Sequence, residues 1–226
     1  MNYYFITGTS KGLGKSITEL LLKDDTNFVY GYSRNCTIKH SNYNHTCLDL
    51  NDLENVKKLK FPTLKKVEKI ILINNAGVIH INNIGNLNND EIISTFSINL
   101  ISPIILSNNF ISKYNEFSKI IVNISSGASN SPIDGWSTYC ASKASLDMFT
   151  RVFKHEQSLR GNSNTAMISP SPGIIDTEMQ QIIRKSDFKE STRFIDYNKN
   201  KLLKTPKEIA QNILVIIENS CIKYID

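Results

Sequence analysis

Short apolar runs alternate with longer segments of mixed polarity along most of the chain. The runs are rich in β-branched and aromatic residues, which is typical of strands. One of them, KIILIN at 69–74, is apolar almost throughout, as expected for a strand buried on both faces of a sheet. We expect strands at 3–7, 28–33, 45–50, 69–74, 119–125 and 165–169, with a short last strand at 223–226.

The segments between these runs show the periodicity of helices. We expect helices at 13–23, 136–160 and 205–219, and two helical segments between 90 and 115 that divide near Pro103. After a turn at Pro172 and Gly173, an irregular polar stretch is expected from 174 to 204. Strands that alternate with helices predict βαβ units and a parallel sheet. The predicted fold class is therefore α/β, a single doubly wound Rossmann domain over 1–226 with a mostly parallel sheet of about seven strands.

Length, composition and charge are those of an ordinary globular protein. The chain has 226 residues, of which 40% are apolar and 21% charged. No segment approaches the ~20 apolar residues of a membrane span, and MNYYFITG shows no pattern of a secretory leader. The net charge of +5 comes from lysines interleaved with acids, so a solvated surface is favoured over nucleic-acid binding. We expect a cytoplasmic homodimer that contacts neither membrane nor nucleic acid.

The cysteines are dispersed, and we expect free thiols at Cys36, Cys47, Cys140 and Cys221. A zinc site would need a cluster of suitable ligands, and the residue types are right at Cys36, His40, His45 and Cys47. Their spacing fits no common zinc motif. We therefore expect no metal site.

The first predicted strand leads directly into the glycine-rich sequence TGTSKGLG at 7–14. Such a turn lets backbone N–H groups approach a phosphate, and the helix that follows adds partial positive charge. The spacing differs from the general G-x-G-x-x-G fingerprint, so the glycines alone would fit simple turn geometry equally well. Their position between strand and helix favours a phosphate site. The expected cofactor contacts are Gly8, Ser10, Lys11, Gly12, Leu13 and Gly14.

The residues after the second predicted strand bear on the kind of dinucleotide. NAD-binding domains usually carry an acid there, which binds the ribose 2′-hydroxyl. This chain has Arg34 at that position and no carboxylate between Phe28 and Cys36. Arg34 and Lys11 could together neutralise a 2′-phosphate, although both could equally be surface cations. We expect NADP(H) rather than NAD.

Polar motifs also follow the later strands, where ligands of open parallel sheets bind. NNAG at 74–77 follows the fourth predicted strand, and Ser126 follows the fifth. SPG at 171–173 follows the sixth, with Thr177 shortly after. Asp49 and Leu50, after the third strand, could border an adenine pocket or simply begin a helix.

Tyr139 and Lys143 lie four residues apart in WSTYCASK, so they share one face of a predicted helix. A phenol has a pKa near 10 and is a poor acid or base at neutral pH. A lysine ammonium about 4–5 Å away favours phenolate by on the order of 3–4 kcal/mol at an effective dielectric near 20, which predicts a lowered pKa for Tyr139. Such a pair met alone is usually a surface face. Its spacing from Asn99 and Ser126 favours a proton-transfer site.

Together, the TGxxxGxG loop, NNAG, Ser126 with Tyr-x-x-x-Lys, and PG-x-x-x-T resemble the short-chain dehydrogenase/reductase family over essentially the whole chain. Within the family, 123–143 and 171–180 are similar to the group that contains sepiapterin reductases and bacterial benzil reductases. The resemblance implies a catalytic tetrad of Asn99, Ser126, Tyr139 and Lys143. It also implies further contacts to the dinucleotide from Asp49, Leu50, Asn75, Ala76, Gly77, Tyr139, Lys143, Pro172, Gly173 and Thr177.

Each member of the tetrad has an expected role. Ser126 would hydrogen-bond the substrate carbonyl oxygen, and Tyr139 would protonate that oxygen as hydride arrives. Asn99 would hold a water that links Lys143 to solvent. The resemblance also implies that Lys143 binds the nicotinamide ribose.

We therefore expect an NADPH-dependent carbonyl reductase. One alternative is a 3-oxoacyl-thioester reductase, because the tetrad acts on the carbonyl group whatever the rest of the substrate is. The other alternative is a non-enzymatic redox sensor that binds dinucleotide. A sensor would not need all four tetrad residues. The resemblance implies a small carbonyl substrate, favouring an aromatic or apolar 1,2-dicarbonyl.

The substrate is expected to contact Ser126, Trp136, Tyr139 and Met179. The stretch at 174–204 is too long for an ordinary βα connection and is expected to form a mobile lid. Met179, Ile182 and Ile183 could close over the substrate from this lid. Their helix-like spacing would equally fit packing on the protein's own core.

Overall fold

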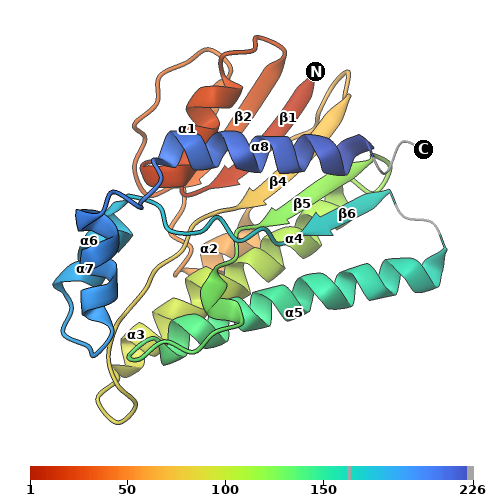
Figure 1. Cartoon of the computed structure of the whole chain (residues 1–226). Coiled ribbons are helices and arrows are strands. Elements are labelled where there is room, and N and C mark those ends of the chain that lie inside the picture. The colour runs from red at the N-terminus through yellow and green to blue at the C-terminus, as the bar shows by residue number, and fades with distance from the viewer. Residues whose placement is uncertain (162–163, 223–226) are drawn as a thin grey trace.

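The computed structural model describes residues 1–161 and 164–222 (Figure 1). The described residues form one parallel sheet with the strand order β3-β2-β1-β4-β5-β6. The strands are β1 (Asn2–Thr7), β2 (Asn27–Ser33), β3 (Tyr43–Cys47), β4 (Lys69–Asn74), β5 (Lys119–Asn123) and β6 (Thr165–Ile168). The strand order reverses between β1 and β4, which is where ligands bind in open α/β sheets. The predicted doubly wound α/β fold is confirmed.

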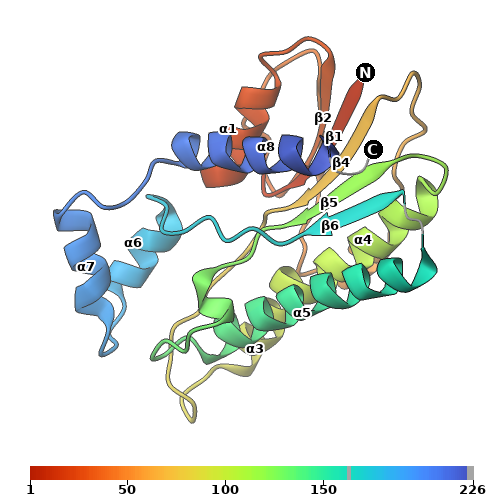
Figure 2. The same cartoon turned by 45° about the vertical axis from the view of Figure 1, so that its right-hand side comes forward.

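Helices cover both faces of the sheet (Figure 2). One face carries α1 (Gly12–Leu21) and α8 (Pro206–Ile222). The other carries α2 (Leu53–Lys58), α3 (Asn89–Phe96), α4 (Ser102–Lys113) and α5 (Ser137–Arg160). A further pair, α6 (Glu178–Lys185) and α7 (Ser191–Lys199), lies beyond the carboxyl ends of the strands (Figure 1).

The apolar run of β4 explains why both faces need helices. Side chains alternate across a strand, so Ile71 and Ile73 join the core beneath α1 and α8, whereas Ile70 and Leu72 join the core beneath α4. All four side chains are at most 1% exposed. Each contributes roughly 1.5–3 kcal/mol to folding through burial. The run therefore fixes β4 in the centre of a three-layer domain.

The third strand and the strand count differ from the prediction. The third strand is Tyr43–Cys47 rather than 45–50, because its pairing with β2 ends at Ser33 opposite Cys47. Leu48 and Leu50 are buried in the core beyond the strand. Their alternation with polar residues is typical of a strand, so the sequence predicted one that continues to residue 50. The described residues form six strands, and the predicted strand at 223–226 lies outside the described residues.

Two helix predictions also need correction. The helical region at 90–115 does not divide at Pro103, which sits in the first turn of α4, where proline is tolerated. It changes instead at Ser97–Ile101, a π-helical segment. The stretch at 174–204 is not irregular, because it contains α6 and α7. Its many polar residues concealed the apolar positions that these two helices bury.

Candidate active site

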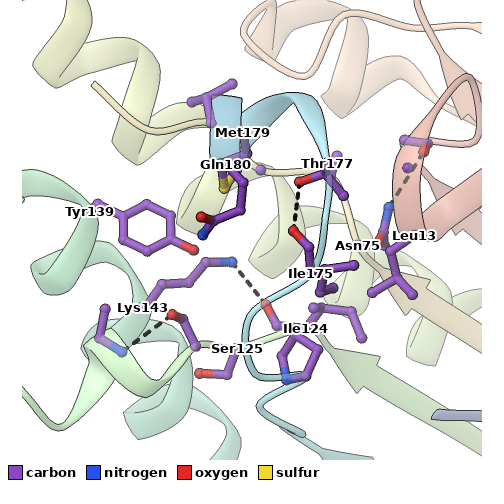
Figure 3. A pocket seen from close by; sticks show the side chains of 18 of the residues that line it. Leu13, Asn75, Ile124, Ser125, Tyr139, Lys143, Ile175, Thr177, Met179 and Gln180 are labelled. Atoms are coloured by element: carbon purple, nitrogen blue, oxygen red, sulfur yellow. Dashed lines mark hydrogen bonds between the residues drawn. The ribbon is translucent and has the colours of Figure 1, made fainter. Parts of the chain in front are cut away.

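A cavity of about 590 Å³ opens at the carboxyl ends of the strands, beside the switch point between β1 and β4 (Figure 3). The structure brings together at this cavity most of the residues predicted for the site. Those lining it are Gly8, Ser10, Lys11, Gly12, Leu13, Arg34, Asp49, Leu50, Asn75, Ala76, Gly77, Ser126, Trp136, Tyr139, Lys143, Pro172, Gly173, Thr177 and Met179. Two predicted residues, Gly14 and Asn99, are not part of the lining.

The glycine loop shapes one end of the cavity. Gly8 has a φ of +76°, in the left-handed region that favours glycine. Gly14 lies behind the lining, where a Cβ would come within 2.3 Å of the Gly8 carbonyl oxygen and 2.4 Å of Asn75 Nδ2. The first turn of α1 can therefore lie directly on the strand end. No side chain caps the N-terminus of α1, so the backbone N–H groups there suit an anion.

The ends of β1 and β4 are joined by side chains of the NNAG segment. Thr7 Oγ1 accepts hydrogen bonds from the backbone N–H groups of Asn75, at 3.0 Å, and Ala76, at 3.1 Å. Asn75 Nδ2 donates in turn to the Thr7 carbonyl oxygen, at 2.9 Å. These bonds hold the floor of the cavity at the switch point.

Tyr139 and Lys143 lie one turn apart on α5, and both are buried. Lys143 Nζ is 5.8 Å from the centroid of the Tyr139 ring and donates a hydrogen bond to the Ile124 carbonyl oxygen, at 2.8 Å (Figure 3). Ser126 follows β5 and hydrogen-bonds Tyr139. Its Oγ also accepts from the backbone N–H of Ala128, at 3.2 Å. The predicted trio of Ser126, Tyr139 and Lys143 thus meets in one place.

Burial dominates the titration of this pair. It raises the pKa of the Tyr139 phenol, and the hydrogen bond with Ser126 opposes this rise. Burial lowers the pKa of Lys143 to about 8, and the nearby Asp147 carboxylate opposes that shift. The prediction of a lowered pKa for Tyr139 is therefore wrong, because burial raises this pKa more than the hydrogen bond with Ser126 lowers it.

Asn99 lies in the π-helical segment, and its side chain is held by the protein. Its Oδ1 accepts from the Val78 backbone N–H, and its Nδ2 donates to the Val78 carbonyl oxygen, both at 2.9 Å. A Cβ at Gly77 would lie 3.4 Å from Asn99 Oδ1 and 3.8 Å from Lys143 Nζ. Asn99 therefore lies directly behind the cavity wall, close to Lys143, with its amide engaged.

The cations predicted to bind a 2′-phosphate have different surroundings. Arg34 is exposed at the rim of the cavity, and no carboxylate in the described part of the chain forms an ion pair with it. Lys11 forms an ion pair with Glu178 of α6, so its charge already has a partner. Asp49 Oδ1 accepts from the Asn51 backbone N–H, at 2.9 Å.

An aromatic cluster forms the other end of the cavity. Trp136 meets Tyr139 edge to face, with centroids 5.6 Å apart, and stacks on Phe194 of α7 at 5.2 Å. Ile183 is buried within this cluster and also lines the cavity. Met179 lines the cavity too, whereas Ile182 is 52% exposed. The apolar face of α6 therefore packs on the protein's own core and also borders the cavity.

The sequence analysis missed lining residues in several elements, including four on α6 and α7. These four are Gln180, Arg193, Phe194 and Tyr197. Gln180 lies three residues before Ile183, so the two share a face of α6, and a helical interpretation of this stretch would have found it. Its side chain is 7% exposed, and its Oε1 has no hydrogen-bond partner among the described residues.

No cluster of potential metal ligands is found in the part of the chain that the structure describes. No three potential ligands among its His, Cys, Asp and Glu residues come together, and Cys36, Cys47 and Cys140 are free thiols. The prediction for Cys221 lies outside the described side chains. None of the described helices is long and apolar enough to cross a bilayer.

Comparisons with known proteins agree with this architecture. The benzil reductase of Bacillus subtilis, described as (S)-benzoin forming, is 40% identical over 96% of this chain and 94% of its own. Sepiapterin reductase of Rattus norvegicus is 33% identical over 59% of this chain and 52% of its own. A solved short-chain dehydrogenase/reductase from Saccharomyces cerevisiae superposes with a TM-score of 0.80 at 24% identity, over 92% of this chain and 86% of that one. The short chain dehydrogenase family matches residues 2–187, and the chain belongs to this family of oxidoreductases.

Proposed function

We propose that the protein is an NADPH-dependent carbonyl reductase that transfers hydride to a small apolar or aromatic carbonyl compound, with a 1,2-dicarbonyl as the preferred type. The observation that carries this proposal is the geometry around Tyr139. Its phenol meets Ser126 and lies one helical turn from Lys143, in a cavity that also reaches the open N-terminus of α1. The proton donor Tyr139 and the anion site at the N-terminus of α1 therefore lie in one cavity.

The residues present fit a nicotinamide dinucleotide. The uncapped N-terminus of α1 offers N–H groups to the phosphates, and Arg34 stands at the rim beyond it. The dinucleotide, when bound, supplies the hydride. Ser126 orients the carbonyl oxygen, and Tyr139 donates a proton to it. The raised pKa of Tyr139 keeps this proton in place at neutral pH, and Lys143 supplies positive charge beside the oxygen as negative charge develops there.

Asn99 acts in this proposal as a positioning residue. Its side-chain amide is committed to Val78, so a water that links Lys143 to solvent would be held by the backbone carbonyl of Asn99 rather than by the side chain. Asn99 lies in a π-helical segment, whose backbone hydrogen bonds run from residue i to i+5, and such segments are frequent at functional sites.

The preference for NADPH rests chiefly on Arg34, because Lys11 is paired with Glu178. Losing one guanidinium–phosphate contact costs roughly 1.5–3 kcal/mol. Arg34→Ala should therefore raise the KM for NADPH by about tenfold or more and leave that for NADH nearly unchanged. Arg160→Ala, at an exposed position at the end of α5, is the matched control. Steady-state kinetics with both cofactors measure this, and equal use of NADPH and NADH by the unmutated protein would refute the preference.

The 1,2-dicarbonyl is supported by the similarity to benzil and sepiapterin reductases and by the aromatic wall. An apolar pocket gains roughly 25 cal/mol per Å² of buried apolar surface, so aryl diketones should be preferred well over tenfold to a small aliphatic ketone. The alternative, a 3-oxoacyl-thioester reductase, has no specific observation in its favour. The test is kcat/KM for benzil, 1-phenyl-1,2-propanedione, cyclohexanone and an acetoacetyl thioester with NADPH. A highest value for the thioester would replace this proposal with the alternative.

The segment 174–204 is proposed to act as a substrate lid. Its two ends are held together, since Ile175 bridges Lys204 and the Asp176 backbone N–H donates to the Lys204 carbonyl oxygen, at 2.9 Å. The α6–α7 pair is therefore joined to the rest of the protein where these two ends meet. The ion pair between Lys11 and Glu178 also links α6 to the glycine loop. Amide hydrogen exchange in α6 should slow when NADP and a diketone analogue are added together. Unchanged exchange throughout 174–204 would count against a lid.

The proposed enzyme works as a cytoplasmic homodimer with no nucleic-acid partner. Exposed apolar side chains on and beside α5 support self-association, among them Ile93, Met148 and Val152, each at least 46% exposed. A second copy of the chain would cover them.

A further inference from the structure

The amide of Gln180 lies in an unusual position. Gln180 belongs to α6, lines the cavity and is 7% exposed. No hydrogen bond joins its side chain to the rest of the described protein, and its Oε1 is enclosed without a partner. Its neighbour Gln181 is exposed. In Figure 3 the Gln180 amide points into the cavity, on the side of Tyr139 and Lys143.

A buried amide without a partner destabilises the fold, because it has lost its hydrogen bonds to water and gained none in return. An apolar side chain would suit the surroundings of α6 better, since Met179 and Ile183 on the same face pack against the aromatic cluster. Because Oε1 is enclosed, the Nε2–H group is the part of this amide that can serve a partner outside the chain. The cavity that Gln180 lines offers a side from which such a partner can approach it.

The position of Gln180 limits which atom of a substrate it can meet. Ser126 and Tyr139 lie together at the cavity wall formed by α5 and the end of β5, where the reacting oxygen is held. Gln180 reaches in from α6, and in Figure 3 its amide lies beside the Tyr139 hydroxyl. The oxygen on the carbon next to the reacting carbonyl is the substrate atom that an amide beside this hydroxyl can meet. A primary amide can donate to a carbonyl oxygen there or accept from a hydroxyl.

We propose that Gln180 is the specificity-determining residue that recognises the second oxygen of the substrate, on the carbon adjacent to the carbonyl that is reduced. This inference rests on the proposed carbonyl reductase function. In the reduction, hydride from the dinucleotide and a proton from Tyr139 convert one C=O group to CH–OH, and the dinucleotide is oxidised. The second carbonyl is unchanged and accepts a hydrogen bond from Gln180 throughout. The product is an α-hydroxy ketone.

The test compares two substrates of nearly the same shape, benzil and deoxybenzoin, in which a CH₂ group replaces the second carbonyl. Gln180→Met keeps the length of the side chain and removes the amide. We expect kcat/KM for benzil to fall by about tenfold or more, as for a buried hydrogen bond that loses one partner, while that for deoxybenzoin stays within about threefold. Taking the ratio of the two substrates within each protein cancels their difference in intrinsic reactivity.

Gln181→Met, on the exposed side of the same helix, is the matched control and should leave both values unchanged. Gln180→Leu, which also removes the amide and adds no charge, should reproduce the selective loss for benzil and serves if the methionine variant folds poorly. An equal loss for both substrates, or no loss for either, would overturn the role of Gln180 and leave the reductase proposal intact. Failure of the unmutated protein to reduce benzil would overturn the role of Gln180, and failure with every carbonyl compound of the panel would overturn both proposals.

Discussion

Tyr139→Phe is expected to lower kcat for carbonyl reduction by at least about 10²-fold, the usual contribution of a general acid. The substitution keeps the ring, which packs edge to face on Trp136, and removes only the hydroxyl that meets Ser126. Affinity for NADPH, followed by fluorescence, should change little, because the anion site at α1 and Arg34 are untouched. Stopped-flow or steady-state oxidation of NADPH with benzil measures the turnover.

The matched control for this experiment is Tyr197→Phe. Tyr197 also lines the cavity, but it belongs to α7 and packs on Phe194 rather than beside Lys143. Loss of its hydroxyl should leave kcat nearly unchanged. Near-normal turnover in Tyr139→Phe, or an equal loss in both variants, would contradict the assignment of Tyr139 as the proton donor.

Lys143→Met is expected to lower kcat by about 10²-fold and to change its dependence on pH. The pKa of Lys143 is about 8, so its ammonium is present below that pH and is lost above it. Reduction by the unmutated enzyme should therefore be nearly constant below about pH 7 and slow as the pH rises through about 8. The residual activity of Lys143→Met should lack this decline. Weaker binding of the dinucleotide is expected as well, if Lys143 also binds the ribose.

Lys119 provides a control for this titration. Burial also lowers its pKa to about 8, but it lies at the start of β5, at the opposite end of the strand from Ser126. Lys119→Met should keep the decline in kcat near pH 8. A decline that persists in Lys143→Met, or one that vanishes in Lys119→Met, would show that another group titrates.

The sequence predicted the sheet and many of the residues that line the cavity, because both depend on local patterns. A continuously apolar run such as 69–74 predicts a central strand, because a strand covered on both faces buries all of its side chains. The glycines at 8, 12 and 14 predicted a phosphate site because they directly follow the first strand. The edge strand β3 was harder to place. Three of its five residues are exposed, so its boundary depends on pairing with β2 rather than on its own composition.

What the sequence could not supply were effects of tertiary burial. The spacing of Tyr139 and Lys143 predicted their proximity, but the direction of the pKa shift of Tyr139 depends on how far both groups are removed from water. Gln180 was overlooked for a similar reason. A glutamine in a polar segment is normally solvated, and only the packing of α6 against Trp136 and its neighbours shows that this amide is enclosed.

The most direct measurement is isotope transfer from NADPH that carries deuterium at the reactive position of the nicotinamide. With benzil and the unmutated protein, we expect one deuterium at the carbinol carbon of the product and one NADPH oxidised for each benzoin formed. Tyr139→Phe under the same conditions should give little labelled product while still binding NADPH. No transfer of deuterium by the unmutated protein to any carbonyl compound in the panel would contradict the proposal that this cavity is the active site of a carbonyl reductase.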